Sequence, residues 1–566
     1  MRRASVFLVV TLLTGLGLRL WGSRWGLPYA FAFDESLVVD NAARFGILHT
    51  LEPRFLAYPT LFLYELFGLY ASYFALGSLM GLFRNVTDFA FTFATDPSVF
   101  YLLGRWATAA AGTATIGVVY LLGKRAFSLP VGLVAAAFLA FFPSHVGESQ
   151  WALPDVTATL LATVAYLFCY LIYAHGQRRY YAAAGFTAGL ATSTMYNGAF
   201  MVFPLYLAHF LRWRETEDSP GKTRRPWRSL VWNRSLLLAG LFLLGGFFLG
   251  SPYWLLRLPA FLAAYLGEAS EVMVGVTVGH ATGEGELPWL WVLRQHWDIN
   301  QTMGAVFLLG VFYALWRHKG QDWLLALPTL ALILFIGAWS MRNLEYLLPI
   351  WPIMAVLGAR MVVELLTPLA RGRSWVWAAA AVVLLSLPLA SIVRSNLALG
   401  QRDTRVVAKE WIETNIPKET ALAFDWYHYS PPLVGTGENY IRYPGTQISL
   451  QSQAYGAQAG LRERLEGFLS TQTTYQLRSL YPKTPDELHQ EGVEYIILSS
   501  YYYSRYFETP PRVDSPARPI FEREGVYFKE LLDPGNRGLA LVAEFRPDSA
   551  TSGPTIKVLK VLRETK

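Results

Sequence analysis

The feature that most constrains this chain is a series of apolar segments spread over residues 1–395. A helix needs about 20 apolar residues to cross a bilayer, and a chain with many such segments cannot fold as one soluble domain. We predict eleven membrane-spanning helices, some of them short enough to require tilted or broken helices. They lie near residues 5–22, 99–121, 129–143, 155–174, 181–195, 198–212, 235–255, 303–316, 323–340, 346–366 and 375–393.

The composition agrees with a polytopic membrane protein. Charged residues make up 16% of the chain, against about 25% in soluble domains, and 15% of the residues are aromatic. The net charge of +7 does not indicate nucleic-acid binding, because the basic residues cluster in short loops, where they set topology. The single cysteine, Cys169, excludes an intrachain disulfide and a cysteine-based metal cluster in this sequence.

The apolar segment at residues 56–83 decides the predicted topology. The N-terminal segment has a basic start, and Arg19, Trp21 and Arg24 stand where a signal peptide would have small residues for cleavage. We therefore expect an uncleaved first span with a cytoplasmic N-terminus. If 56–83 does not cross, every basic cluster between spans is cytoplasmic, whereas one crossing would move them all outside. The positive-inside rule favours the first arrangement, so we expect 56–83 to lie along the membrane interface or to dip in and return.

Two domains follow from this arrangement. Residues 1–395 form the predicted transmembrane domain, whose first outer loop, at about 23–98, holds interfacial helices. Residues 396–566 form a predicted soluble α/β domain on the extracytoplasmic side. It begins with an amphipathic helix pattern at 402–419 and continues with short β-rich runs bounded by turn residues. The aromatic run 501–507 could stack on sugar rings, but a buried edge or a membrane contact explains it as well.

The predicted outer face carries several polar residues that could do chemistry. Asp34 and Glu35 follow the first span, and Asp155 follows Pro154 at the start of another span. Acids at such places complement the positive end of a helix, and a carboxylate at the membrane boundary could also act as a general base. His145 and Glu148 belong to the same outer loop as Asp155 and could share its cleft.

Two further segments complete the predicted outer face. Asn197 and Gly198 interrupt the apolar pattern and predict a tight turn. Arg342 lies on the outer side, against the positive-inside trend, and so needs a partner, which could be a lipid phosphate, Glu345 or a backbone carbonyl. The chain has no P-loop, dinucleotide fingerprint or H-E-x-x-H motif, so an ATP-driven pump is not expected.

These motifs occur in an order that resembles a known class of enzyme. The acidic pair is followed by Y-P-x-L, then by E-S-x-x-A-x-P-D, T-x-Y-N-G and a late R-x-x-x-Y-L-L-P, all within residues 1–395. In this the chain resembles the polytopic GT-C glycosyltransferases. It is most similar to glycosyltransferase family 39, which includes protein O-mannosyltransferases and bacterial aminoarabinose–lipid A transferases.

The resemblance implies roles for individual residues. Asp34 would be the essential aspartate of the first loop, with Glu35 as its companion and Asp155 as the acid of the second outer loop. The late motif would supply Arg342 and Tyr346 to the donor. Tyr58 stands where relatives often carry lysine or tyrosine, and the resemblance makes it a candidate for the donor site. Arg54, Arg294 and His296 are further candidates for contact with the phosphate. Met195 likewise replaces a lysine before Tyr196 and Asn197.

The implied reaction is a single displacement on a sugar carried by polyprenyl phosphate. Asp34 would accept the proton of an acceptor hydroxyl, and cationic groups would stabilise the departing phosphate, with inversion at the sugar. A divalent cation such as Mg²⁺ or Mn²⁺ between Asp34 and Asp155 is a further option, because carboxylate oxygens suit it. The acceptor would be a protein, a lipid or a glycan at the outer face of the plasma (inner) membrane.

Two alternatives stay open from the sequence. A transporter or flippase of lipid-linked sugars would share the lipid-admitting cavity, but it would favour charged groups near the bilayer midplane, and most predicted spans have few acids. A non-catalytic member would use its C-terminal domain to bind glycan.

Overall fold

The structure, a computed structural model, describes residues 2–562 except 54–55, 57, 218–227, 275–286, 437–440, 443–459, 482, 509 and 534–537. Within the described part, seven helical segments are long and apolar enough to cross a membrane. They are α1 (Arg2–Leu20), α5 (Ser98–Ala126), α8 (Pro154–His175), α15 (Pro288–Arg317), α16 (Gly320–Gly337), η3 with α17 (Leu344–Ile350 and Trp351–Ala370) and α18 (Ser374–Leu399). These helices confirm a polytopic membrane protein.

Four shorter helices occupy the other predicted spans. They are α6 (Leu129–Ala140), α9 (Arg178–Thr194), α10 (Val202–Glu217) and α12 (Arg234–Gly250). A Cβ atom on Gly185 of α9 would overlap the carbonyl oxygen of Ala239 in α12, so the two backbones come together where a side chain is missing. The total of eleven spans stays a prediction for these four helices.

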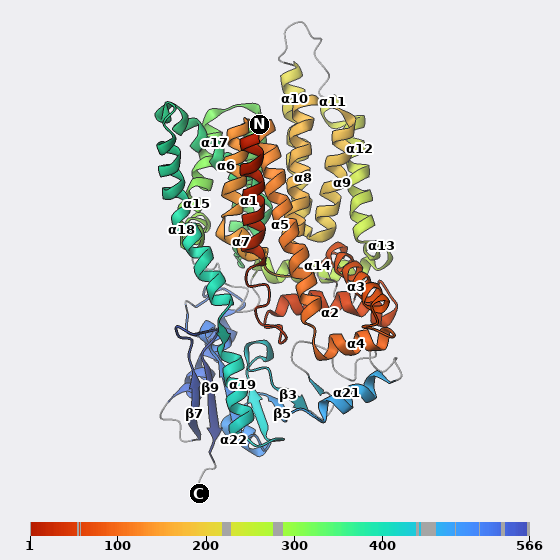
Figure 1. Ribbon diagram of the computed structural model, residues 1–566, viewed down its shortest axis with the longest axis vertical. Helices are drawn as coiled ribbons and strands as arrows, with labels where there is room; N and C mark the ends of the chain where they lie inside the picture. Colours follow the sequence, from red (N-terminus) through yellow and green to blue (C-terminus); the bar gives the residue numbers. More distant parts are fainter. Residues whose placement is uncertain are drawn as a thin grey trace.

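The spanning helices stand side by side, and the C-terminal domain lies at the end of the bundle away from the N-terminus (Figure 1). Helices α10 and α11 (Arg228–Val231) meet at the N-terminal end of the bundle (Figure 1). The described parts of the basic segment, at 212–217 and 228–234, therefore lie opposite the C-terminal domain.

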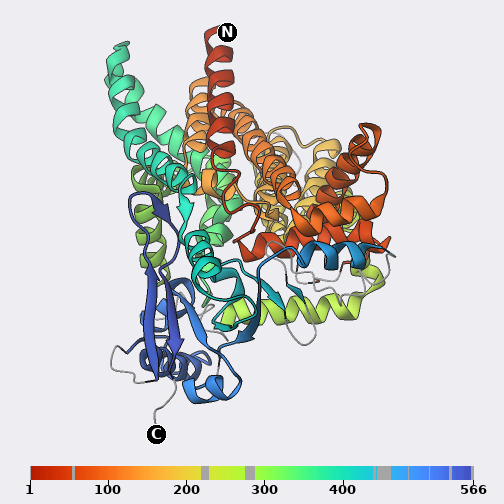
Figure 2. The same ribbon diagram turned by 60° about the horizontal axis from the view of Figure 1, so that its bottom comes forward.

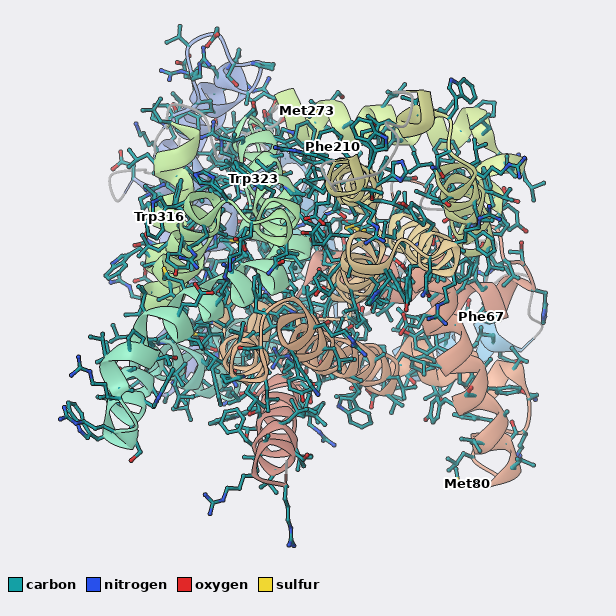
Figure 3. All side chains as sticks on the ribbon, turned by 90° about the horizontal axis from the view of Figure 1, so that it is seen from above. Phe67, Met80, Phe210, Met273, Trp316 and Trp323 are labelled. Atoms are coloured by element: carbon teal, nitrogen blue, oxygen red, sulfur yellow. The ribbon has the colours of Figure 1, made fainter. Side chains whose placement is uncertain are left out.

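The long loop after α1 forms short helices at the C-terminal-domain end of the bundle. They are α2 (Phe33–Leu48), α3 (Leu61–Leu79) and α4 (Val86–Thr95). Later loops add α7 (Pro143–Glu148), α13 (Tyr253–Leu256) and α14 (Leu258–Val274) at the same end. Seen from above, the chain from Phe67 to Met80 runs across the view (Figure 3). Helix α3 is not among the seven long spans, and Leu76 and Leu79 on it are exposed, as is Met80 directly after it.

The C-terminal domain is an α/β domain around a seven-stranded sheet, with the order β4-β3-β5-β2-β6-β9-β7. The strands are β2 (Ala421–Phe424), β3 (Val434–Thr436), β4 (Ile441–Arg442), β5 (Thr474–Ser479), β6 (Tyr495–Ser499), β7 (Leu539–Phe545) and β9 (Ile556–Val561). Strands β3, β5, β2 and β6 are parallel. A small separate pair joins β1 (Arg402–Asp403) to β8 (Thr551–Ser552).

The described residues of this domain also form the α-helices α19 (Thr404–Asn415), α21 (Leu461–Leu469), α22 (Pro485–Gln490), α23 (Ser500–Tyr503) and α24 (Arg518–Leu532), with short turns η4 (Tyr427–Tyr429) and η5 (Ser504–Tyr506). The predicted amphipathic helix is α19, and the β-rich runs are β2, β6, β7 and β9. In the aromatic run 501–507, Tyr503 and Tyr506 are buried in the domain core, whereas Tyr501 is 48% exposed.

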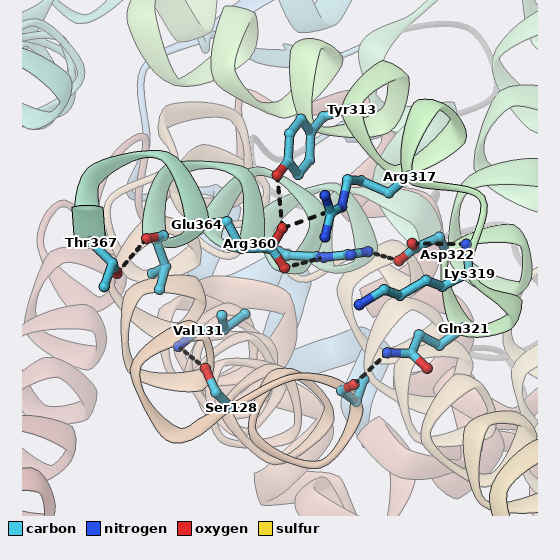
Figure 4. A network of polar contacts seen from close by, with 12 residues as sticks. Ser128, Val131, Tyr313, Arg317, Lys319, Gln321, Asp322, Arg360, Glu364 and Thr367 are labelled. Carbon is cyan, nitrogen blue, oxygen red and sulfur yellow. Dashed lines mark hydrogen bonds and ion pairs between the residues drawn. The ribbon is translucent and has the colours of Figure 1, made fainter. Parts of the chain in front are cut away.

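A polar network connects the membrane-spanning helices α15, α16 and α17 at the end of the bundle where the 317–320 and 370–374 loops lie (Figure 4). Arg360 of α17 forms a buried ion pair with Asp322 at the start of α16 and a second one, at 3.0 Å, with Glu364. Tyr313 of α15 donates to Glu364 at 2.7 Å. Breaking a buried pair of this kind costs about 3–5 kcal/mol, so the network holds these helices together.

Candidate active site

Asp34 and Glu35 lie in the first turn of α2, but they face different surroundings. Asp34 is exposed, and Glu35 is fully buried. The Glu35 carboxylate accepts from Arg105 of α5 at 2.6 and 2.8 Å and from the backbone N–H of Ala152 at 2.7 Å. This fork of two paired bonds fixes the first turn of α2 against α5 and against the loop before α8. Glu35 therefore holds the backbone from which Asp34 projects.

Arg105 also holds the chain that leads into α2. Its guanidinium donates to the carbonyl oxygens of Ser23 at 2.7 Å and Trp25 at 2.8 Å. This buried arginine has one carboxylate and two carbonyl groups as hydrogen-bond partners. It therefore balances the charge of Glu35 and also fixes the conformation of the loop. The residue was not among the predicted site residues. The available signal was a lone arginine in an apolar segment, which needs a partner inside the protein.

The structure brings Asp34 and Asp155 into the same cluster. The two carboxylates interact electrostatically, and both act on Tyr58. The pKa of Tyr58 is raised well above its usual value, first by burial and then by Asp34, Asp155 and Glu268. The neutral phenol of Tyr58 thus lies among acids, where it can donate a hydrogen bond but cannot supply positive charge.

Glu268 was not predicted as a site residue. It lies on α14, in the chain between α12 and α15, and it is exposed. Glu268 also acts on Tyr346 electrostatically, which places α14 beside the same cluster. No sequence signal identifies it, because an acid in an amphipathic outer helix is most often solvated.

Glu148 and Glu345 form the second part of the acidic cluster. The pKa of Glu148 is raised well above its ordinary value of 4.5, by burial and then by the charges of Glu345 and Asp155. Glu345 accepts from the side chain of Asn343 at 3.1 Å and interacts electrostatically with Asp34. Burial and neighbouring negative charge both disfavour ionisation, so the Glu148 carboxyl group keeps its proton to a higher pH than a solvated glutamate does.

A cavity of about 560 Å³ adjoins these acids and contains arginines. Its lining includes Glu148, Glu345, Arg294, Arg342 and Trp151. The Nε of Arg342 donates to the carbonyl oxygen of Trp339 at 2.9 Å. The lining of the cavity therefore combines two arginines with two carboxyl groups, and the arginines suit contact with an anionic group.

Other predicted site residues are placed differently. His145 is fully buried, with Nδ1 2.9 Å from the guanidinium of Arg19, and it does not line the cavity. His296 is also fully buried, 3.5 Å from the side chain of Asn300. Both rings pack inside the helical bundle, and the cleft role of His145 and the phosphate contact of His296 stay predictions. Arg54 lies outside the described residues.

The predicted turn at Asn197 is a short 3₁₀ helix, η1 (Tyr196–Met201). A Cβ on Gly198 would overlap the backbone of Ala191 in α9, so only glycine allows this close return of the chain. The hydroxyl of Tyr196 accepts from the indole of Trp254 at 3.2 Å. Asn197 is half-buried, and its side-chain oxygen is buried without a hydrogen-bond partner.

The described residues contain no group of three or more His, Cys, Asp or Glu side chains arranged to hold a metal ion. Asp34 and Asp155 interact electrostatically and could supply two oxygen ligands. A cation bridging them stays a prediction.

Known proteins share parts of this architecture. Residues 102–239 match the family model of the dolichyl-phosphate-mannose-protein mannosyltransferases. The matched segment is less than half of the chain, includes Asp155 and Asn197, and excludes Asp34 and Arg342. Over this segment the match confirms the predicted resemblance to membrane glycosyltransferases. No curated protein matches the chain in sequence.

Several solved structures show some similarity to this chain. ArnT from Cupriavidus metallidurans, bound to undecaprenyl phosphate, is 13% identical, with 98% of this chain and 97% of that chain covered at a TM-score of 0.49. The oligosaccharyltransferase AglB from Archaeoglobus fulgidus, with an inhibitory peptide and a dolichol-phosphate, is 14% identical, with 92% and 72% covered at 0.47. The Pmt1-Pmt2 complex of S. cerevisiae, bound to the sugar donor, is 21% identical, with 46% and 34% covered at 0.34.

Proposed function

We propose that this chain is a membrane glycosyltransferase. It transfers a sugar from a polyprenyl-phosphate donor to an extracytoplasmic acceptor, with inversion at the sugar and with Asp34 as the general base. The observation that carries the proposal is the contrast within one helical turn: Asp34 is exposed, while Glu35 is locked by Arg105. The match of residues 102–239 to a mannosyltransferase family supports the same reaction class.

The geometry supplies the two groups that the reaction needs. A base must take the proton from the acceptor hydroxyl as the hydroxyl attacks the sugar carbon, and the bond from that carbon to the phosphate oxygen breaks. Negative charge then grows on the phosphate, and preorganised arginines stabilise it. Arg294 and Arg342 line the cavity next to the acids and are the candidates for this contact.

The remaining predicted residues take supporting roles in this proposal. Glu35 positions Asp34 through its pairing with Arg105. Asp155 and Tyr58 share the cluster with Asp34, where they orient the acceptor or the donor sugar by hydrogen bonds. Tyr346 lies in the same cluster and is the candidate for a donor contact. The site lies at the outer face of the plasma membrane, with the N-terminus in the cytoplasm.

The experiment is a donor screen with the full-length protein in lipid nanodiscs. Radiolabelled polyprenyl-phosphate mannose, arabinose, aminoarabinose and galacturonate are each offered with extracts of envelope protein, lipid and glycan as acceptors. The proposal predicts transfer of label from one of these donors. Movement of labelled lipid between the leaflets of sealed proteoliposomes, without any transfer, would instead identify a flippase and would refute the proposal.

A further inference from the structure

The loop that leads from α1 into Asp34 is held from two sides by two buried arginines. Arg105 of the transmembrane domain binds the carbonyl oxygens of Ser23 and Trp25 from one side. Arg405 of the C-terminal domain lies over the Phe31 ring, with its guanidinium carbon 3.7 Å from the ring centroid. Phe31 is 5% exposed and comes three residues before Asp34.

Hydrogen bonds within the C-terminal domain fix the orientation of Arg405. Its Nε and one terminal nitrogen donate to the two oxygens of Asp403 at 2.8 and 2.7 Å, and the other terminal nitrogen donates to the carbonyl oxygen of His428 at 2.9 Å. These bonds use the edge of the guanidinium plane. The face of the plane is left to stack on Phe31, an arrangement that lysine cannot reproduce.

A second contact reinforces the first. The ring of His428 lies edge-on to Phe33, with the centroids 4.9 Å apart, and Trp426 lies 6.1 Å from the same ring. Phe33 is the first residue of α2 and precedes Asp34 directly. The turn after β2 and the start of α19 therefore both press on the segment that carries the proposed base.

The loop has room to move beside this contact. A cavity of about 500 Å³ lies between residues 20–31 and residues 399–406. A segment that borders a cavity is not fixed by close packing on that side. The stacking of Arg405 on Phe31 consequently limits where the loop can go.

We propose that Arg405 is a positioning residue, which holds the 25–33 loop and through it sets the Asp34 carboxylate for proton transfer. The C-terminal domain then affects the chemical step of the reaction through the position of Asp34. The inference rests on the proposed function, because it gives Asp34 the role of the base.

The test uses four variants of the full-length protein in nanodiscs. Arg405→Lys keeps a cation beside Asp403 but loses the stacked plane, Arg405→Gln removes the charge, and Phe31→Leu alters the loop side while leaving the Asp403 pair intact. The matched control is Arg464→Gln. Arg464 also joins the C-terminal domain to the first outer loop, pairing with Asp88 at 2.6 Å and lying over Phe91, but it is remote in sequence from Asp34 (Figure 2 shows α21 beside the first-loop helices).

The first readout is hydrogen exchange of the backbone amides of residues 23–34, which needs no activity. We expect exchange to rise by about tenfold or more in the Arg405 variants and in Phe31→Leu, and to stay unchanged in Arg464→Gln. Unchanged exchange in Arg405→Lys and Phe31→Leu overturns the proposal, whatever the enzyme does.

The second readout separates kcat from the KM for the donor. We expect kcat to fall by about tenfold to a hundredfold in Arg405→Lys and Phe31→Leu, with the donor KM within about threefold of the parent value. A double variant that combines Arg405→Lys with Phe31→Leu should lose no more than either single variant, because both substitutions remove the same contact. An unchanged kcat, or a loss that appears equally in Arg464→Gln, overturns the proposal. Absence of transfer by the parent protein from every donor refutes the proposed function instead.

Discussion

At the scale of single residues, the buried pair of Glu35 and Arg105 sets the position of Asp34. Glu35→Gln keeps the shape but leaves Arg105 buried without a counter-charge, and we expect a loss of about 3–5 kcal/mol in the free energy of unfolding, seen as a lower Tm. The control is Glu52→Gln, whose exposed pair with Arg257 is worth at most about 1 kcal/mol. Equal shifts of Tm in the two variants would show that the buried pair is not structural.

Glu148 gives the residue scale a prediction on pH. Its folded-state pKa lies above the ordinary value of 4.5, so between these two values the folded protein binds more protons than the unfolded chain. The free energy of unfolding therefore falls as pH rises through this window. We expect the Tm of Glu148→Gln to fall less than the parent Tm between about pH 5 and about pH 8, measured by differential scanning fluorimetry. Parallel curves of Tm against pH for the variant and the parent would contradict the raised pKa of Glu148. The control is Glu466→Gln, which changes an exposed residue of α21.

At the scale of elements, the backbone of η1 packs closely against α9 at Gly198. We expect Gly198→Ala to destabilise the protein by about 1–3 kcal/mol, because the new methyl group would overlap the backbone of Ala191. The matched control is Gly240→Ala in α12, where a Cβ would meet nothing within 4 Å and helix propensity favours alanine. Thermal unfolding of both variants in detergent measures the difference. A Tm for Gly198→Ala at or above that of Gly240→Ala would show that the contact can relax.

The elements also show what the sequence could and could not predict. Helical spans and the β-rich runs are local patterns of hydrophobicity, so α5, α8, β2 and β6 are recognisable without a fold. The burial of His145 and His296 is not local, because each depends on which residues of other helices lie beside it. Asp34 was recognisable as an acid at a helix start. The positions of Arg105 and Arg405 on either side of its loop required the assembled chain.

At the scale of the whole molecule, the basic loops and the C-terminal domain lie at opposite ends of the bundle (Figure 1). In a variant with Cys169→Ser, we expect Glu410→Cys in α19 to react with a membrane-impermeant maleimide in intact cells. We expect Lys319→Cys, between α15 and α16, to react only after permeabilisation, because positive loops stay in the cytoplasm. The opposite pattern would invert the proposed orientation and would place Asp34 on the cytoplasmic side.

The central claim is that Asp34 accepts a proton during transfer from a polyprenyl-phosphate sugar. The most direct measurement is single-turnover transfer by Asp34→Asn with the donor found in the screen, next to Asp96→Asn, which changes an exposed acid on the same outer loop. Loss of a general base costs about 10²–10⁴-fold in rate. We predict this loss for Asp34→Asn with donor binding retained, and the parent rate for Asp96→Asn. Transfer by Asp34→Asn at the parent rate would contradict the account.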